Sequence, residues 1–546
     1  MRYTLVLIAT ALVLPSAVRA ADPPVTFQTH SLDRALFDLR TAADFVGGEP
    51  AVKAVNKGIQ NLFGEKGFEG LDINRPVAGY VILAPKPEDI TAVVALPVTD
   101  EKAFLALCDR ASNEKHKDLG KGLYQLPAPD GPVKARLRFS DGYAYIAYGF
   151  SPEPALGASA MVPVGKLYDP TEKATVAAKL HFDRVTPEVK KALPGVLKGI
   201  KTALFAAPGI GGQEKMILAP FEEALDQLAV RYALLLGGAD TATVRVSIDA
   251  PTSDLVVEAT LTPKPETALA KELAALKPTG NRFGGLITAD TAAGFQTRLP
   301  FFFNDELKTA TVKALEEGQK LVAKPGSWKE TSDELFKGLI RTVKSGEADV
   351  VAGVRGPDKD GDFALAGAVA FAEPAALEKE FKSHFEKNAP PSEQDRMKWN
   401  AAKAGAVNIH TYKLPEQDVS DFGKPFGGNK STLAFAFAPT GIFFVVGPDP
   451  VPVIKDALAV KPAAAPVLDV VVNPARVIQF VEKAGGRAQD AEILLGKEDK
   501  LRSATSLRVT GGADVRVRYA LNLRLFPRAA AGAIVTTEKV ERFEKK

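Results

Sequence analysis

Three aspartates at alternating positions are the residues in this sequence whose types best suit a metal ion. Asp358, Asp360 and Asp362 occur in the stretch GPDKDGD, and Ca²⁺ prefers such carboxylate oxygens. An EF-hand loop needs glycine after the third acid and a later glutamate, whereas Gly361 precedes the third acid and alanines occupy the glutamate region. Asp and Gly are also ordinary turn residues. We therefore expect a turn between two strands, with weak calcium binding as the alternative.

The other residues capable of chemistry do not form a recognisable motif. No two histidines stand at i, i+4, no serine lies in a GxSxG elbow, and PGIGGQEK at 208–215 lacks the P-loop spacing. We expect no catalytic residues, no cofactor and no further metal site, which favours a protein that is not an enzyme. The alternative is a hydrolase whose acids converge only in the fold. Surface or loop positions are expected for the five histidines, which are His30, His116, His181, His384 and His410.

Cys108 is the only cysteine, so the chain cannot form an internal disulfide. A thiol could act as a nucleophile or form a bridge to another chain, but free cysteine is also among the most buried residue types. In the internal alignment described next, Cys108 falls opposite Phe381. A position that accepts phenylalanine is a core position, and we expect Cys108 to pack in the core.

The chain contains an internal repeat that would position any such site. ITAVVALPVTDEKAFLALC at 90–108 resembles FALAGAVAFAEPAALEKEF at 363–381. Further pairs follow in the same order: GLYQLP with HTYKLP, GFSPEP with GPDPVP, KLHFDRV with VVNPARV, and DLVVEATLT with DVRVRYALN. The common order predicts an ancient duplication with two domains, 21–280 and 281–546. The long period excludes a solenoid.

The repeated unit predicts an α+β fold. Short turns join most of the apolar segments, so each unit should hold a largely antiparallel sheet of about six strands, with helices covering one face. Residues 78–84 and 90–98 should form a hairpin, and Asp100 or Thr99 should cap the helix that follows. The first unit carries about 32 extra residues, and we place a helical insert at about 186–236. Its basic amphipathic pattern favours packing on the sheet over lying on a membrane.

The first 20 residues have the pattern of a signal peptide. Arg2 precedes an apolar run, and Val18 and Ala20 occupy the small-residue positions of a cleavage site before Ala21. The run is short for a membrane span and contains Pro15. Cleavage takes the 69 lysines and arginines to 67, against 66 acids, which is not the basic balance of a nucleic-acid-binding protein. We expect export to the periplasm or the medium, with no transmembrane segment after signal removal.

Several sequence segments resemble those of uncharacterised exported two-unit proteins common in planctomycete bacteria. These are GLDINRPVAGYVIL, LTPKPETALAKELA and VVAGVRGPDKDGDFALAGAV. The resemblance implies a periplasmic or secreted location and a domain of unknown function, without an activity or site residues to carry over.

These observations lead to one functional hypothesis and two alternatives. We expect a non-catalytic envelope protein that acts in binding or scaffolding, whose partner is an envelope protein, a wall component or a lipid. One alternative is a carrier of lipid or another apolar ligand in a groove between the two units. The other is the periplasmic hydrolase without a visible motif.

Overall fold

The structure is a computed structural model. It describes residues 22–65, 67–127, 132–191, 236–299, 305–322, 329–346, 348–415, 421–485 and 505–525. The expected signal peptide, the motif at 208–215 and most of the expected helical insert lie outside these residues.

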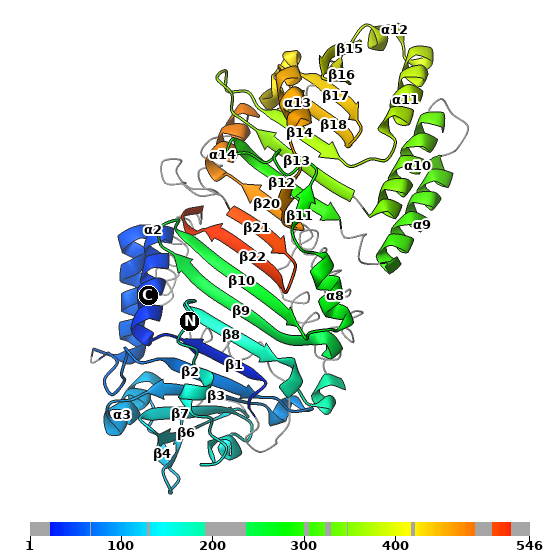
Figure 1. Cartoon of the computed structure of the whole chain (residues 1–546). Helices are drawn as coiled ribbons and strands as arrows, with labels where there is room; N and C mark the ends of the chain where they lie inside the picture. Colours follow the sequence, from blue (N-terminus) through cyan, green and yellow to red (C-terminus); the bar gives the residue numbers. More distant parts are fainter. Residues whose placement is uncertain are drawn as a thin grey trace. The chain divides into compact units, whose positions relative to one another are not determined.

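The chain divides into two compact units (Figure 1). The first contains Met1–Ile248 and Val256–Ala270, and the second contains Asp249–Leu255 and Lys271–Lys546. From the sequence we place the boundary at 280/281, ten residues after the end of the first unit.

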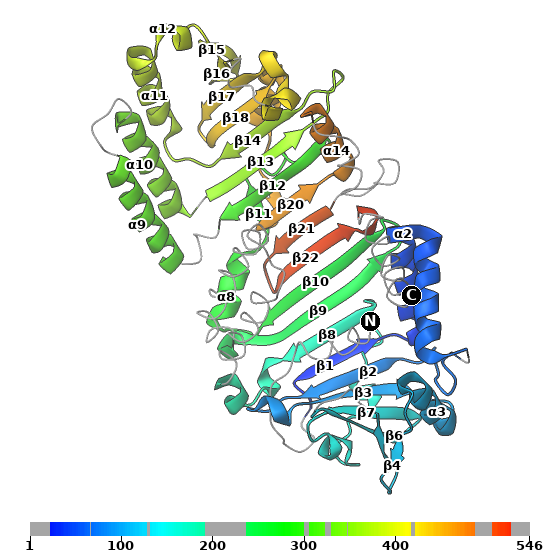
Figure 2. The ribbon, with the colours of Figure 1, turned by 180° about the vertical axis from the view of Figure 1, so that it is seen from behind.

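The first unit is built on an antiparallel sheet of ten described strands, which Figure 2 shows from behind. Its order is β4-β5-β6-β7-β3-β2-β1-β8-β9-β10. The strands are β1 (Val25–Thr29), β2 (Val77–Ile82), β3 (Thr91–Pro97), β4 (Lys117–Asp118), β5 (Leu123–Leu126), β6 (Lys134–Ser140), β7 (Tyr143–Gly149), β8 (Val176–His181), β9 (Ala239–Asp249) and β10 (Asp254–Pro263).

The sheet of the second unit has the same order, β15-β16-β17-β18-β14-β13-β12-β20-β21-β22. Its strands are β12 (Thr291–Leu299), β13 (Ala348–Arg355), β14 (Ala364–Val369), β15 (Met397–Ala404), β16 (Val407–Lys413), β17 (Thr432–Ala438), β18 (Gly441–Gly447), β20 (Leu468–Val472), β21 (Thr505–Thr510) and β22 (Val515–Asn522). Two short strands, β11 (Thr279–Asn281) and β19 (Ala463–Ala465), pair separately.

The helices also occur at matching points of the two units. Between the first two strands, α2 (Leu32–Phe63) is broken at Gly48, which has φ 64°, and the second unit has two helices there. The remaining described helices of the first unit are η1 (Pro87–Asp89), α3 (Glu101–Ser112), η2 (Glu153–Leu156), α4 (Val164–Leu167) and η3 (Phe182–Arg184). Those of the second unit include α9 (Asp305–Val322), α10 (Lys329–Ser345), α11 (Pro374–Asn388), α12 (Pro391–Gln394), α13 (Pro450–Ala459) and α14 (Pro474–Lys483), and α8 (Ala268–Ala275) spans the boundary.

Helices cover both faces at one end of each sheet. On β7, Tyr145 and Ala147 pack with Leu156 of η2, whereas the alternate residues Ala144 and Ile146 pack with Phe104 and other residues of α3. Successive residues of a strand point to opposite faces, so η2 and α3 lie on opposite faces. We expect from the sequence that only one face is covered. Burial on both faces explains why strands such as β3 and β7 are apolar almost throughout.

The same arrangement holds in the second unit. Ala434 and Ala436 of β17 pack in one cluster with Ile454 of α13, whereas Phe435 between them contacts Phe381 of α11, with 5.8 Å between ring centroids.

The expected α+β class with largely antiparallel sheets is confirmed. The hairpin of β2 and β3 forms, and the Asp100 carboxylate caps α3 by accepting from the Ala103 N–H. Each unit has ten described strands in place of the expected six. β1, β4 and β8 are among the additional strands of the first unit, and neither β1 nor β8 has a strong sequence pattern of its own. The five sequence pairs fall on matching strands and strand ends. The duplication itself stays a prediction, which the shared strand order supports.

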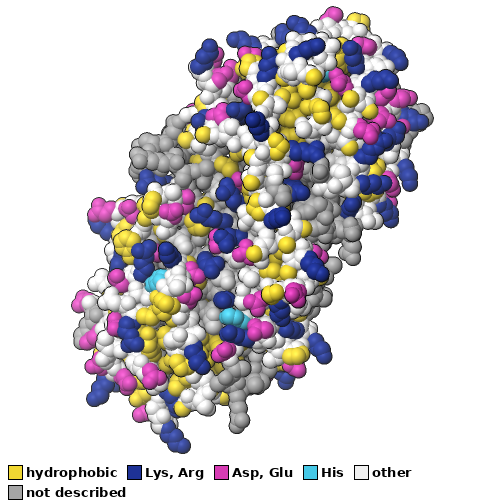
Figure 3. Space-filling model, in the orientation of Figure 1, with side chains coloured by type: hydrophobic (Ala, Val, Ile, Leu, Met, Phe, Trp, Pro, Cys, Tyr) yellow, Lys and Arg dark blue, Asp and Glu magenta, His cyan; other side chains and the backbone are white. Residues whose placement is uncertain are grey.

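Among the described residues, none of the helices combines the length and the apolar composition that a membrane span requires. Acidic and basic side chains alternate over the face of the molecule drawn in Figure 3, without a broad region of one charge sign.

Candidate functional site

The polar face of β1, β8 and β9 carries the candidate site. In the antiparallel register, Thr26 pairs with Lys179 and Lys179 with Thr243. Because side chains two residues apart share a face, the next row along the same face is Gln28–Ala177–Arg245, and His181 begins a third row.

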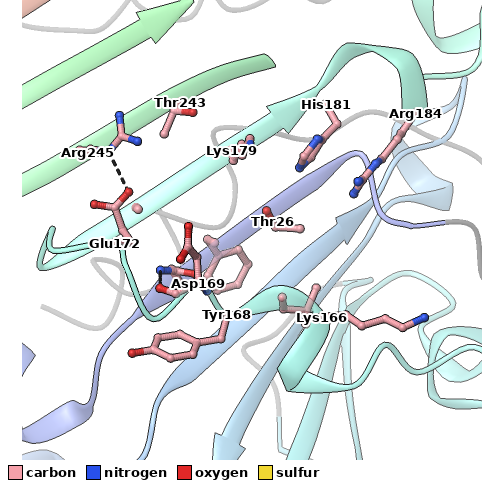
Figure 4. Close-up of a pocket in the computed structure, with 14 residues that line it drawn as sticks. Thr26, Lys166, Tyr168, Asp169, Glu172, Lys179, His181, Arg184, Thr243 and Arg245 are labelled. Carbon is pink, nitrogen blue, oxygen red and sulfur yellow. Dashed lines mark hydrogen bonds and ion pairs between the residues drawn. The ribbon is translucent and has the colours of Figure 1, made fainter. Parts of the chain in front are cut away.

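A cavity of about 250 Å³ opens over these rows (Figure 4). The loop from α4 to β8 and the short helix η3 supply its other walls. Its lining residues are Thr26, Phe27, Gln28, Lys166, Leu167, Tyr168, Asp169, Glu172, Ala177, Lys179, His181, Arg184, Thr243 and Arg245. They include four lysines and arginines but two carboxylates, so the cavity carries excess positive charge even with His181 neutral.

Hydrogen bonds fix one end of the cavity. The Gln28 amide donates to the Asp169 carbonyl at 3.0 Å and accepts from the Asp169 N–H at 2.7 Å, which ties the loop to β1. The Arg245 Nε donates to the Glu172 carboxylate at 2.8 Å. Burial acts to raise the pKa of Glu172, but the Ala174 N–H and the Arg245 guanidinium outweigh it, and the pKa is lowered. Arg245 is thus already neutralised by the protein.

The other end of the cavity contains two lysines without such partners. Among the described residues, Lys166 and Lys179 form no ion pair, whereas Arg184 pairs with the exposed Asp22 at 3.8 Å and donates to the Pro23 carbonyl at 3.4 Å. His181 and Arg184 extend next to each other at this end (Figure 4). Burial, followed by the charges of Arg184 and Lys179, lowers the pKa of His181 below its ordinary value of 6.5.

This arrangement is suited to binding an anion. Cations, two threonine hydroxyls and a histidine surround a small space, and hydrogen bonds from charged donors are the strong ones. The described residues of the lining include no serine and no cysteine. Its two carboxylates hold the loop and Arg245, and hydrogen bonds from Thr171, together with nearby cations, lower the pKa of Asp169. The lining therefore favours binding over acid–base catalysis.

The matching face of the second unit has no lysine at the position of Lys179, although Arg476 aligns with Arg184. The register places Val471, between Gly294 and Ser506, at the position of Lys179. The next row is Gln296–Asp469–Arg508, with Asp469 in place of Ala177. Arg508 donates to both carboxylate oxygens of Asp469, at 2.9 and 3.3 Å. The arginine that both units share at this position is thus neutralised within the sheet of the second unit, and the charge of Lys179 has no counterpart there.

The three aspartates of the expected turn do not converge on a metal site. The Asp358 carboxylate accepts from the N–H groups of Asp360 and Asp362, both at 2.9 Å, and the segment joins β13 to β14. Asp362 pairs with Lys483 at 2.8 Å. Within the described residues, no three histidine, cysteine, aspartate or glutamate side chains are placed to hold a metal ion.

The expectation of surface or loop positions is wrong for two histidines. His384 is buried in α11, and His410 of β16 is 1% exposed among Trp399, Phe435 and Phe437. His410 Nδ1 accepts from the Asn400 N–H at 3.1 Å, so Nε2 carries the proton toward Glu378 at 3.0 Å. Both ring nitrogens are occupied, which makes this pair a structural link rather than a catalytic base.

Cys108 lies at the edge of the core, half-buried against the cluster around Phe104 and Leu137. Burial, then the negative charge of Asp109, raises the pKa of its thiol to about 12. A thiol with such a pKa stays protonated at neutral pH and is a poor nucleophile.

Sequence reasoning did not single out the cavity residues. Lys179, His181 and Arg184 all lie in KLHFDRV, which the repeat identifies only as a structural match to VVNPARV. The alignment of these two segments did contain a signal for the cavity, because a lysine and a histidine of the first unit stand where the second unit has valine and asparagine. Glu172 and Arg245 are 73 residues apart, so no local pattern could link them.

Comparison with known proteins does not identify the chain. No model of a known protein family matches it, and no curated protein matches its sequence. A solved structure titled "Structure of crystal form I of TP0453" matches at 9% identity and a TM-score of 0.23, covering 46% of this chain and 80% of that chain. A likeness at this TM-score carries no argument about fold or function.

Proposed function

We propose that the chain is an exported, non-catalytic binding protein of the cell envelope that holds a small anionic ligand in the cavity of its first unit. The observation that supports this function is Lys179 next to His181 on the polar face of the first unit, where the second unit has Val471 and Asn473; among the described residues Lys179 forms no ion pair. Export rests on the signal-like first 20 residues. The polar lining of this cavity does not favour a lipid tail.

Isothermal titration calorimetry of the mature chain with inorganic sulfate at pH 6.0 tests the proposal. We expect one sulfate per chain, with an affinity that falls as sodium chloride is added, because salt screens exposed charges. Lys179→Val copies the second unit, and it should weaken binding by about tenfold, since a hydrogen bond to a charged group contributes about 1.5–3 kcal/mol.

Lys134→Val is the matched control, because Lys134 is an exposed strand lysine of the same unit outside the cavity. It should leave the affinity unchanged. Absence of sulfate binding, or equal weakening by both variants, would contradict the proposed function.

A further inference from the structure

His181 differs from the other four histidines in its hydrogen bonding. A ring nitrogen contacts Tyr168 in His30 (2.8 Å), Asp109 in His116 (2.9 Å), Asn388 in His384 (3.3 Å) and Glu378 in His410 (3.0 Å). Within the described part of the chain, the ring nitrogens of His181 form no hydrogen bond, and its side chain does not cap η3. The histidine whose nitrogens are left for a ligand is the one that lines the cavity.

The groups around His181 determine its charge. Lys179 precedes it on β8, Arg184 and Asp183 follow on η3, and Asp240 lies on β9. On the β1 side, the His181 N–H donates to the neutral Pro24 carbonyl. The two cations and burial outweigh the two carboxylates, so the imidazole is neutral near pH 7 in the empty cavity. A bound anion would reverse this balance, because it neutralises the cations and attracts an imidazolium.

We infer that the cavity binds its anion together with a proton that His181 takes up, so the site loads in mildly acidic medium and releases its ligand as the pH rises. This inference rests on the proposed function. The ligand class it implies is an oxyanion such as sulfate or a phosphate monoester, whose oxygens accept from the imidazolium, Lys179 and Arg184 together. No covalent step is involved, since one proton moves from solvent to a ring nitrogen.

The sign of the pH dependence follows from linkage. In the empty cavity the pKa of His181 lies below 6.5, and the anion raises it. Proton uptake therefore occurs at pH values between the two pKa values. Affinity should rise as the pH falls through the higher value and level off below the lower one, by about tenfold for each unit that separates them.

Sulfate is the suitable probe, because it stays a dianion over the whole range. We expect its affinity for the full mature chain to fall from pH 5.5 to 8.0, by up to about tenfold for each unit that separates the two pKa values. Calorimetry in two buffers of different ionisation enthalpy should show uptake of a fraction of a proton per sulfate at pH values between the two pKa values.

His181→Asn introduces the residue that the second unit has at position 473. It should abolish the proton uptake and flatten the pH profile, while sulfate binding persists at its weaker high-pH level. His116→Asn is the matched control, because His116 lies in the first unit but outside the cavity, and it should retain the wild-type uptake.

The possible failures are distinguishable. Sulfate binding that is sensitive to Lys179→Val but independent of pH would overturn the proton linkage and leave the proposed function standing. Proton uptake that survives His181→Asn would also overturn the inference. If sulfate does not bind at any pH, both the function and the inference fail.

Discussion

The strand at the centre of the polar face carries Ala177, Lys179 and His181 in the first unit, whereas its counterpart in the second unit carries Asp469 and Val471 and is followed by Asn473. The strands around it follow the same order in both units. Core positions keep their apolar character, as Leu156 and Ile454 show at matching places, both almost fully buried. The difference indicates that the strand order depends on the apolar positions, and that the charge of the polar face can change without altering the order.

The largest expected effect concerns the two core positions. Leu156→Ala and Ile454→Ala should each destabilise their own unit by about 2–5 kcal/mol, because each leaves a cavity in a close-packed cluster. Both tryptophans, Trp328 and Trp399, belong to the second unit, so their fluorescence follows its unfolding.

In urea titrations, Ile454→Ala should shift the tryptophan fluorescence transition to lower urea concentration. Leu156→Ala should leave that transition in place and shift only the part of the circular dichroism change that comes from unfolding of the first unit. If Leu156→Ala moves the fluorescence transition as far as Ile454→Ala does, the two units do not unfold separately.

The buried His410–Glu378 pair has no counterpart among the cavity residues of the first unit. It should make the free energy of unfolding of the second unit depend on pH. Burial lowers the pKa of His410, although Glu378 acts to raise it. The unfolded state therefore takes up a proton near pH 6.5 that the folded state does not yet bind. The free energy of unfolding should fall as the pH falls below about 6.5 and be constant above it.

His410→Gln should cost about 1–3 kcal/mol at pH 7.5, since it disturbs hydrogen bonds to a buried group, and it should remove this part of the acid sensitivity. Urea titrations followed by tryptophan fluorescence at pH 7.5 and 5.5 measure both effects. An unchanged pH dependence in the variant would show that His410 does not cause it. His116→Gln in the first unit serves as the control.

Ala177→Asp tests whether charge alone accounts for the expected difference in anion binding between the polar faces of the two units. The new carboxylate would lie beside Arg245, as Asp469 lies beside Arg508, and would repel an anion at Lys179. We expect sulfate affinity at pH 6.0 to fall by about tenfold, which corresponds to about 1.4 kcal/mol.

Ala177→Asn has nearly the same size without the charge, and it should bind more tightly than the aspartate variant in the same calorimetric titration. Equal losses in the two variants would assign the effect to size and not to charge.

The smallest effect is expected at Cys108, which the repeat places opposite Phe381 of the aromatic cluster. With a thiol pKa of about 12, only a minute fraction is thiolate at pH 8, and iodoacetamide should label the native protein far more slowly than the urea-unfolded chain. Mass spectrometry of the alkylated protein measures both rates. Rapid labelling of the native chain would contradict its place at the edge of the core.

Local patterns were sufficient for part of the fold. The hairpin of β2 and β3, the Asp100 cap and the antiparallel class all depend on neighbours in sequence, and the structure confirms them. The sequence did not show that helices cover both faces of each sheet, because the side on which a helix packs depends on contacts between distant segments. The positions of His384 and His410 were missed for the same reason, since burial of a histidine depends on aromatic partners elsewhere in the chain.

The sequence by itself determined the repeated order of segments, the absence of disulfides and the lack of a local catalytic motif, because each is a property of composition or spacing. Only the tertiary structure decided which distant residues line the cavity next to Lys179. Thr26 and Lys179 are adjacent solely through the pairing of β1 with β8, and Thr243 solely through β9. These three polar residues are far apart in the sequence, and the pairing of their strands places them together in one wall of the cavity. A pattern read from a single sequence specifies such long-range pairing weakly.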